Sequence, residues 1–154
     1  MANTYSQIYI QLIFAVHGRQ SLISEFHREE LQQFITGIVQ KWEQKMLSVF
    51  CMPDHTHLLI GLNPKTAVSD LVRDIKAGSS KYINDRHWLN QKFSWQAGFG
   101  AFSYSKSQID RVVKYILNQE QHHHKSTFKE EYIDFLKKFE VEFDEKYFFE
   151  FIDH

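Results

Sequence analysis

The sequence contains one cysteine, no long apolar run and almost no net charge. The lone Cys51 excludes an intramolecular disulfide and fits a reducing, cytoplasmic setting; in its apolar surroundings it is expected to be a small buried residue. The N-terminal stretch MANTYSQIYIQLIFAV has no basic lead-in, and its apolar residues alternate with polar ones. We therefore expect neither a signal peptide nor a membrane-spanning helix.

What is present is enough for a folded domain. The chain has 154 residues, of which 43% are hydrophobic. This predicts a single domain over 1–154, with a core region at 1–125 and a C-terminal helix and aromatic, acidic tail at 126–154. The net charge of -1 is spread unevenly: residues 64–125 carry ten Lys or Arg and five Asp or Glu, whereas residues 126–154 carry four and nine. A locally basic middle favours a surface that binds polyanions, although ordinary charged helix faces would also produce it.

The order of the periodic segments predicts an α+β fold. Apolar and polar residues alternate over 7–16, which indicates a strand, and helical spacing follows from the N-cap candidate Ser24 to about Trp42. Two strands at 46–52 and 54–61, a helix at about 66–88 and a strand ending near Ser105 complete a β-α-β-β-α-β order. This order is typical of the ferredoxin-like arrangement, in which both helices pack on one face of an antiparallel sheet.

The stretch DHTHLLIG at 54–61 places two histidines on the same side of a predicted strand. His55 and His57 are separated by two strand rises, roughly 6.5 Å, so both imidazoles can converge on one metal ion. The opposite side carries Thr56, Leu58 and Ile60 and is expected to pack on the helices, which leaves the histidines on the open face of the sheet. A half-buried strand with two histidines on its wetter face remains the alternative.

Two more helices are predicted after the sheet. The first begins near Ser107, which forms a Ser-x-x-Asp capping signature with Asp110. Tyr115 and Gln119 are one turn apart beside its apolar stripe, which consists of Ile109, Val112, Val113, Ile116 and Leu117. The second helix is expected at about 127–139. The run at 122–124, His122, His123 and His124, has metal-binding side chains, but we interpret it as a solvated helix end.

Together these stretches resemble the single-tyrosine HUH transposases of the IS200-like kind and their REP-associated relatives. The matching segments are MPDHTHLLIGL, WQAGFGAFSYS and VVKYILNQEQHH followed by TFKEEY, in the same order and spacing as in that family. Thr56 departs from the pattern, since the family usually has a bulkier hydrophobic residue between the histidines. We expect this difference to cost a little packing without changing the chemistry.

The resemblance implies a mechanism. Tyr115 would attack a single-stranded DNA phosphate, form a 5′-phosphotyrosine link and release a 3′-OH, which a second strand end later reverses. His55, His57 and Gln119 would bind Mg²⁺ or Mn²⁺. The substrate would be single-stranded DNA that folds into a hairpin. The protein would be a homodimer, in which the tyrosine helix of one chain often completes the histidine site of the other.

Two other functions compete with this one. A non-catalytic module could bind single-stranded nucleic acid on an open ferredoxin-like sheet, but such modules present aromatic side chains where this strand has histidines. A zinc hydrolase would need an acidic base beside the histidines, and alternation places Asp54 on the opposite face. Arg111 could steady charge near Tyr115. Lys76, Lys81 and Arg86 are candidate phosphate contacts, although each could equally belong to a solvated helix face.

Overall fold

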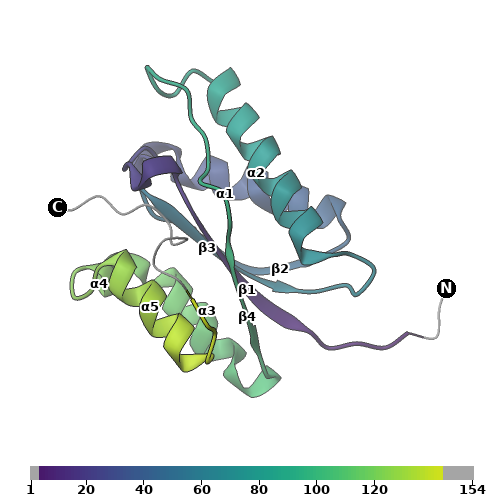
Figure 1. Ribbon diagram of the computed structural model, residues 1–154. Coiled ribbons are helices and arrows are strands. Elements are labelled where there is room, and N and C mark those ends of the chain that lie inside the picture. The colour runs from purple at the N-terminus through teal and green to yellow at the C-terminus, as the bar shows by residue number, and fades with distance from the viewer. Residues whose placement is uncertain (1–3, 144–154) are drawn as a thin grey trace.

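The computed structural model describes residues 4–143, which form a four-stranded antiparallel sheet with helices on both faces (Figure 1). The strand order is β2-β3-β1-β4. Each pair of neighbouring strands is antiparallel, as the predicted ferredoxin-like α+β fold requires. The elements of this part of the chain are β1 (Tyr9–Ala15), α1 (Glu25–Lys41), β2 (Lys45–Cys51), β3 (His55–Gly61), α2 (Val68–Asp85) and β4 (Gly100–Tyr104).

Helices α1 and α2 cover one face of the sheet and enclose the main core. Alternation in β3 sends Leu58 and Ile60 into this core, where they meet Leu31 and Ile35 of α1, so the predicted sidedness of the strand is confirmed. Thr56 is fully buried, and so is Cys51 as expected. Helix α1 starts where the sequence indicates, because the Ser24 side chain accepts a hydrogen bond from the backbone N–H of His27.

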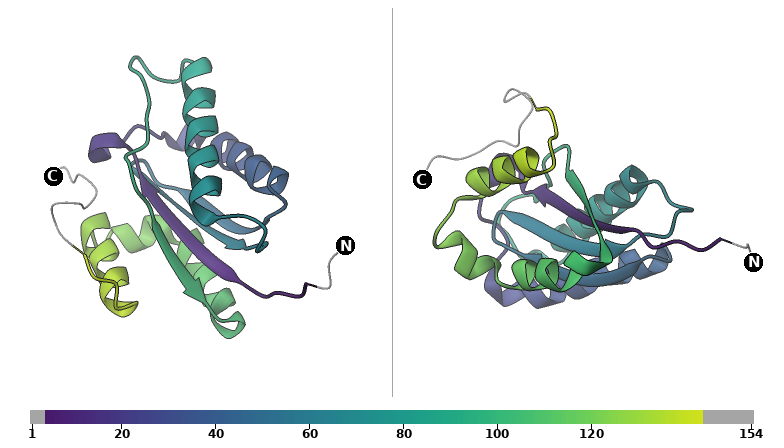
Figure 2. Two further views of the ribbon diagram at one scale, coloured as in Figure 1. Left: turned by 45° about the vertical axis from the view of Figure 1, so that its right-hand side comes forward. Right: turned by 90° about the horizontal axis from the view of Figure 1, so that it is seen from below.

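The opposite face of the sheet is not open. It is covered by α3 (Ile109–Leu117), α4 (Gln119–His123) and α5 (Phe128–Lys138), which lie across the sheet from α1 and α2 (Figures 1 and 2). Ile116 of α3 packs on Leu59, and Phe128 of α5 packs on Ile13 and Ala15. As a result His55 and His57 are 1% and 0% exposed. The expectation of solvent-facing histidines is therefore wrong, because apolar stripes on the C-terminal helices bury this face as well.

The tyrosine helix differs from its predicted form at both ends. The capping box uses Ser105 and Gln108, at a short 3₁₀ turn (Lys106–Gln108), and not Ser107 with Asp110. At the other end α3 stops at Leu117, which is 54% exposed and so does not belong to the buried stripe. Helix α5 begins after Thr127, whose side chain accepts from the backbone of Glu130, in agreement with the predicted start. Residues 144–154 of the expected aromatic, acidic tail lie outside the described residues.

A glycine allows α5 to approach the sheet closely. A Cβ atom on Gly100 of β4 would lie 2.8 Å from the hydroxyl oxygen of Tyr132, closer than real Cβ atoms come. Tyr132 is buried against Phe102 and Phe128 on this face. Gly100 thus leaves room for the side chain of Tyr132, the residue next to Glu131 on α5. Among the described residues, no helix is both long and apolar enough to cross a membrane.

Candidate active site

The two histidines of β3 are oriented from behind. His57 Nδ1 lies 2.7 Å from the amide oxygen of Gln11 on β1, and His55 Nδ1 lies 2.6 Å from a carboxylate oxygen of Asp54. The carboxylate of Asp54 also binds the guanidinium of Arg19, and the side chains of Arg19 and Asp54 are 7% and 13% exposed. Each imidazole therefore has its Nδ1 engaged and its Nε2 directed away from the strand.

Asp54 and His55 have displaced pKa values. Burial opposes the ionisation of Asp54, but its hydrogen bond to His55 and the charge of Arg19 prevail and hold the pKa of Asp54 at about 2. Burial lowers the pKa of His55 to about 4, and the contact with Asp54 offsets this only in part. A neutral imidazole is the form that binds metals.

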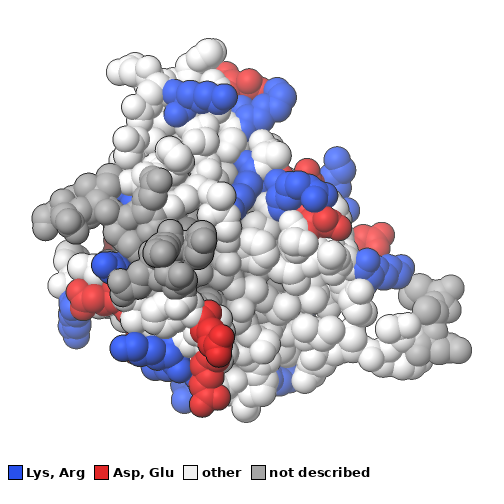
Figure 3. All heavy atoms as spheres, viewed as in Figure 1, with Lys and Arg blue, Asp and Glu red and all other residues white. Residues whose placement is uncertain are grey.

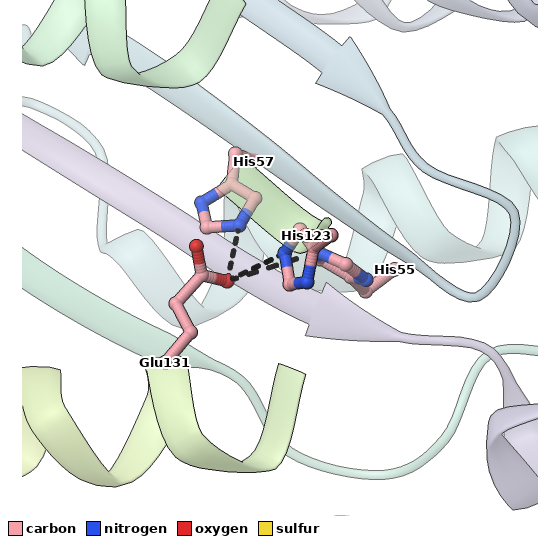
Figure 4. Close-up of side chains that lie close together, drawn as sticks. All are labelled: His55, His57, His123 and Glu131. Atoms are coloured by element: carbon pink, nitrogen blue, oxygen red, sulfur yellow. Dashed lines mark hydrogen bonds and ion pairs between the residues drawn. The ribbon is translucent and has the colours of Figure 1, made fainter. Parts of the chain in front are cut away.

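Glu131 of α5 lies at the centre of the cluster (Figure 4). Its Oε1 is 3.1 Å from His57 Nε2, 3.8 Å from His55 Nε2 and 3.3 Å from His123 Nε2. The side chain is 2% exposed. Burial opposes its ionisation, but the positive potential of His57 and hydrogen bonds from His123 and His57 hold the pKa of Glu131 far below its usual range. Glu131 is therefore a buried carboxylate surrounded by imidazoles.

These positions correct two expectations about acidic groups and histidines. The zinc hydrolase was disfavoured because no carboxylate was expected beside the histidines. In the structure, Asp54 and Glu131 both contact the histidine pair. His123 points into the cluster and is not a solvated helix end. His122 is half-buried, with its ring 4.8 Å from that of Tyr115. Only His124 is exposed as expected.

Gln119 is fully buried and links three members of the site. Its Nε2 donates to Glu131 Oε2 at 3.2 Å, and its Oε1 lies 3.0 Å from His123 Nε2. The helix that carries Tyr115 ends before Gln119, since Asn118 caps α3 and α4 begins at the next residue. The two side chains nevertheless reach the same carboxylate, so the sequence correctly placed them together.

The hydroxyl of Tyr115 donates a hydrogen bond to Oε2 of Glu131. Its ring centroid is 6.1 Å from that of His57. Burial and the adjacent negative charge of Glu131 raise the pKa of Tyr115 well above its usual value. The structure therefore brings the expected nucleophile to the expected histidines within one chain, with a carboxylate between them that the sequence analysis did not anticipate.

The donor set of this cluster fits a divalent cation. His55, His57, His123 and Glu131 each offer one ligand atom, and these atoms lie within 4.8 Å of one another. His55 Nε2 is buried and makes no hydrogen bond within the described residues. A bound metal ion would give this nitrogen the partner it lacks. Imidazole and carboxylate ligands suit Mn²⁺ and related transition metals better than Mg²⁺, which prefers oxygen and water.

A cleft of about 710 Å³ opens beside Tyr115, between α3 and α5. Its walls carry the cations Arg111 and Lys138, the aromatic side chains of Tyr104, Phe135 and Phe139, and the carboxylates of Glu130, Glu131 and Asp134. Arg111 therefore lies beside the tyrosine, as the sequence suggested.

The other candidate phosphate contacts lie elsewhere. Lys76 and Lys81 are on α2, across the sheet from Tyr115. The ammonium of Lys76 donates to the carbonyls of Gln96 and Gly98, and Lys81 pairs with Asp85 one turn away. Arg86 lies near Glu30. On the face shown in Figure 3, basic and acidic side chains are interspersed, so the basic middle of the sequence does not form a single patch there.

Comparison with known proteins assigns the family. Residues 4–119 match the family described as "Transposase IS200 like", which covers both histidines and both Tyr115 and Gln119. The chain belongs to the IS200-like transposase family. The predicted resemblance is thereby confirmed, and the family implies an enzyme that cuts DNA.

Individual relatives of this transposase are distant in sequence. The ISDra2 transposase TnpA of Deinococcus radiodurans is 22% identical over 120 residues, which span 73% of this chain and 84% of the relative. A transposase structure from the same organism has a TM-score of 0.61 at 21% identity and covers 77% of this chain and 95% of its own. A REP-associated tyrosine transposase bound to a REP hairpin has a TM-score of 0.60 at 17% identity, over 80% and 73%. At such identities the two structures establish the fold.

Two residues of the site were missed by the sequence analysis, Glu131 and His123. Glu131 lies outside the matched family segment, yet its sequence position carries a signal. On α5 it falls in the buried stripe formed by Phe128, Tyr132 and Leu136, where a carboxylate is out of place unless it has a partner. His123 gave no such signal, because its direction depends on the break at Asn118.

Proposed function

We propose that this transposase cuts and rejoins single-stranded DNA through a 5′-phosphotyrosine intermediate formed on Tyr115. The observation that carries the proposal is the hydrogen bond from the Tyr115 hydroxyl to Glu131, a carboxylate that also contacts the His55–His57 pair. A phenol tied into a buried cluster of metal-binding side chains, beside an open cleft, is arranged for reaction and not merely for packing.

The chemical step is a phosphoryl transfer. The phenol oxygen of Tyr115 attacks phosphorus, a tyrosine–phosphate bond forms, and the bond to the 3′ oxygen breaks; that oxygen takes up a proton and leaves as a 3′-OH. Reversal by the 3′-OH of a second strand restores a phosphodiester and frees the tyrosine. The number of phosphodiester-type bonds is conserved, so rejoining requires no external energy source.

The phenol must lose its proton during attack. Burial and Glu131 raise the pKa of Tyr115, so free phenolate is even scarcer than the roughly one part in a thousand expected at pH 7 for an ordinary tyrosine. The Glu131 carboxylate accepts the hydrogen bond from the phenol and is therefore positioned as the base that takes its proton. Mg²⁺ or Mn²⁺, held by His55 and His57 with Gln119 beside them, would neutralise phosphate charge and stabilise the leaving oxygen.

The proposed substrate is single-stranded DNA that folds into a hairpin. The related REP-associated transposase is bound to a REP hairpin, which supports this choice. A flexible strand can bend its phosphate to the end of the cleft, whereas a stiff duplex resists that bend. The alternative, a non-catalytic module that stacks bases on an open sheet, is disfavoured because the C-terminal helices cover that face.

The test is adduct formation on labelled hairpin DNA with Mn²⁺. Wild-type protein should yield a covalent complex that resists denaturant. Tyr115→Phe should yield none while retaining DNA binding, and Tyr132→Phe serves as the matched control because Tyr132 is a buried tyrosine of the same layer. Binding without an adduct in the wild type would favour the non-catalytic module, and an unchanged adduct in Tyr115→Phe would refute the nucleophile.

Strand preference needs a separate competition experiment. A perfectly paired duplex of the same sequence should neither displace the hairpin nor be cut. Binding to the hairpin should weaken with salt by about 0.7 log units per log of salt for each phosphate contact. Equal cleavage of duplex and hairpin would assign the protein to a different class of nuclease.

A further inference from the structure

Glu131 lies among the candidate metal-binding side chains, a position that was expected for Gln119. We propose that Glu131 is a metal ligand: Oε1 binds the ion together with His55 and His57, while Oε2 holds the hydroxyl of Tyr115. This inference rests on the proposed function and adds to it a direct bridge between metal and nucleophile, supplied by helix α5.

The orientation of the two imidazoles supports this ligand set. Gln11 Oε1 and Asp54 Oδ1, which face the two Nδ1 atoms, are oxygens that can only accept. Each imidazole therefore donates its Nδ1–H, which leaves Nε2 as the ring nitrogen available to a metal ion. Both Nε2 atoms face Glu131 Oε1, at 3.1 and 3.8 Å. Two imidazole nitrogens and a carboxylate oxygen that converge in this way are the donor atoms that a divalent transition metal takes.

The spacing of the three atoms suits such a cation. Ligand atoms bonded at about 2.0–2.2 Å to one ion lie roughly 3–4 Å apart, which is the range these distances occupy. Two histidines and one carboxylate are a recurrent ligand set for divalent transition metals and leave positions open for substrate oxygens. All three side chains are nearly fully buried, so the site is preformed by the fold.

Gln119 then has a different task from the one its spacing suggests. Its Nε2 donates to Glu131 Oε2 and its Oε1 faces His123 Nε2, so both ends of the amide are occupied by neighbours. It is a positioning residue that holds the carboxylate and the third histidine in place. Loss of such an outer partner typically costs 10–100-fold in metal affinity.

The test measures Mn²⁺ binding to the full chain by titration calorimetry, without DNA. Glu131→Gln preserves shape and should weaken binding by at least about 100-fold, because a ligand is lost and not merely its support. Glu130→Gln, the exposed neighbouring carboxylate on α5, is the matched control and should bind as wild type does. Affinity of Glu131→Gln within about threefold of wild type would overturn the inference.

A second measurement keeps the inference testable if Glu131→Gln does not fold. Wild-type crystals with Mn²⁺ should show an anomalous-scattering peak within bonding distance of Glu131 Oε1, His55 Nε2 and His57 Nε2. A peak bonded to the histidines and Gln119 with Glu131 turned away would refute the inference while leaving the tyrosine mechanism intact. Adduct formation by wild type that persists in a chelator, with no Mn²⁺ bound, would overturn the inference and the role of the metal, but not the tyrosine nucleophile.

Discussion

The variant Asp54→Asn removes the carboxylate that lies behind His55 and leaves both histidines in place. Asparagine keeps the size of Asp54 and can still accept from His55 Nδ1, but it cannot form the buried ion pair with Arg19. The side chains of Arg19 and Asp54 are 7% and 13% exposed, so little solvent is available to replace the lost charge. Removing one partner of a buried pair is therefore expected to destabilise the protein measurably.

The magnitude follows from the ionisation of Asp54. The hydrogen bond to His55 and the charge of Arg19 outweigh burial and lower the pKa of Asp54 from 3.8 to about 2. This difference corresponds to about 2–3 kcal/mol of stability that depends on the charged form. Because asparagine resembles protonated aspartate, the variant should lose about 2–3 kcal/mol of unfolding free energy at neutral pH.

The pH dependence has a definite sign. A carboxyl whose pKa is lower in the folded state stabilises the fold above its unfolded pKa, and this contribution is lost as pH falls through the folded value. The gap in unfolding free energy between wild type and Asp54→Asn should thus be full above pH 4 and close as pH approaches 2. Denaturant titrations of metal-free protein across this range measure it.

An exposed ion pair provides the control for Asp54→Asn. Asp70→Asn breaks the pair with Arg73, whose side chains are 46% and 74% exposed, and should change stability by less than about 1 kcal/mol. If Asp54→Asn also stays within about 1 kcal/mol of wild type, or if its deficit persists unchanged at pH 2, the argument from the buried pair is refuted.

Three further outcomes are expected. His57→Gln should abolish Mn²⁺-dependent adduct formation with little loss of fold, whereas His57→Ala should also lower the unfolding midpoint, because this histidine is buried and not on an open face. A mixture of Tyr115→Phe and His57→Gln proteins should recover no cleavage, since the tyrosine meets Glu131 of its own chain; recovery would demonstrate sites shared between subunits of a dimer. Gly100→Ala should push α5 from β4 and weaken Mn²⁺ binding in calorimetry, and unchanged affinity would show that this close approach does not position Glu131.

The sheet and its sidedness could be predicted because strand alternation is a local property. Leu58 and Ile60 identify, within a few residues of sequence, the face of β3 that packs on α1 and α2, and the structure agrees. The covering of the histidine face was not predictable in this way. It depends on Phe128 and Leu136 of α5 packing against β1 residues more than a hundred positions earlier, a tertiary contact with no local counterpart in the sequence.

In the candidate site, too, the local pairing could be predicted from the sequence and the tertiary contact could not. Tyr115 and Gln119 were grouped by helical spacing, yet the helix is interrupted between them, with α3 ending at Leu117 and α4 starting after Asn118. Gln119 and His123 of α4 contact each other, and Glu131 of α5 contacts both of them. Three side chains four residues apart thus reach one carboxylate through a broken helix. This arrangement explains why spacing pointed to Tyr115, while the carboxylate that joins it to the histidines emerged only from the packing of α5.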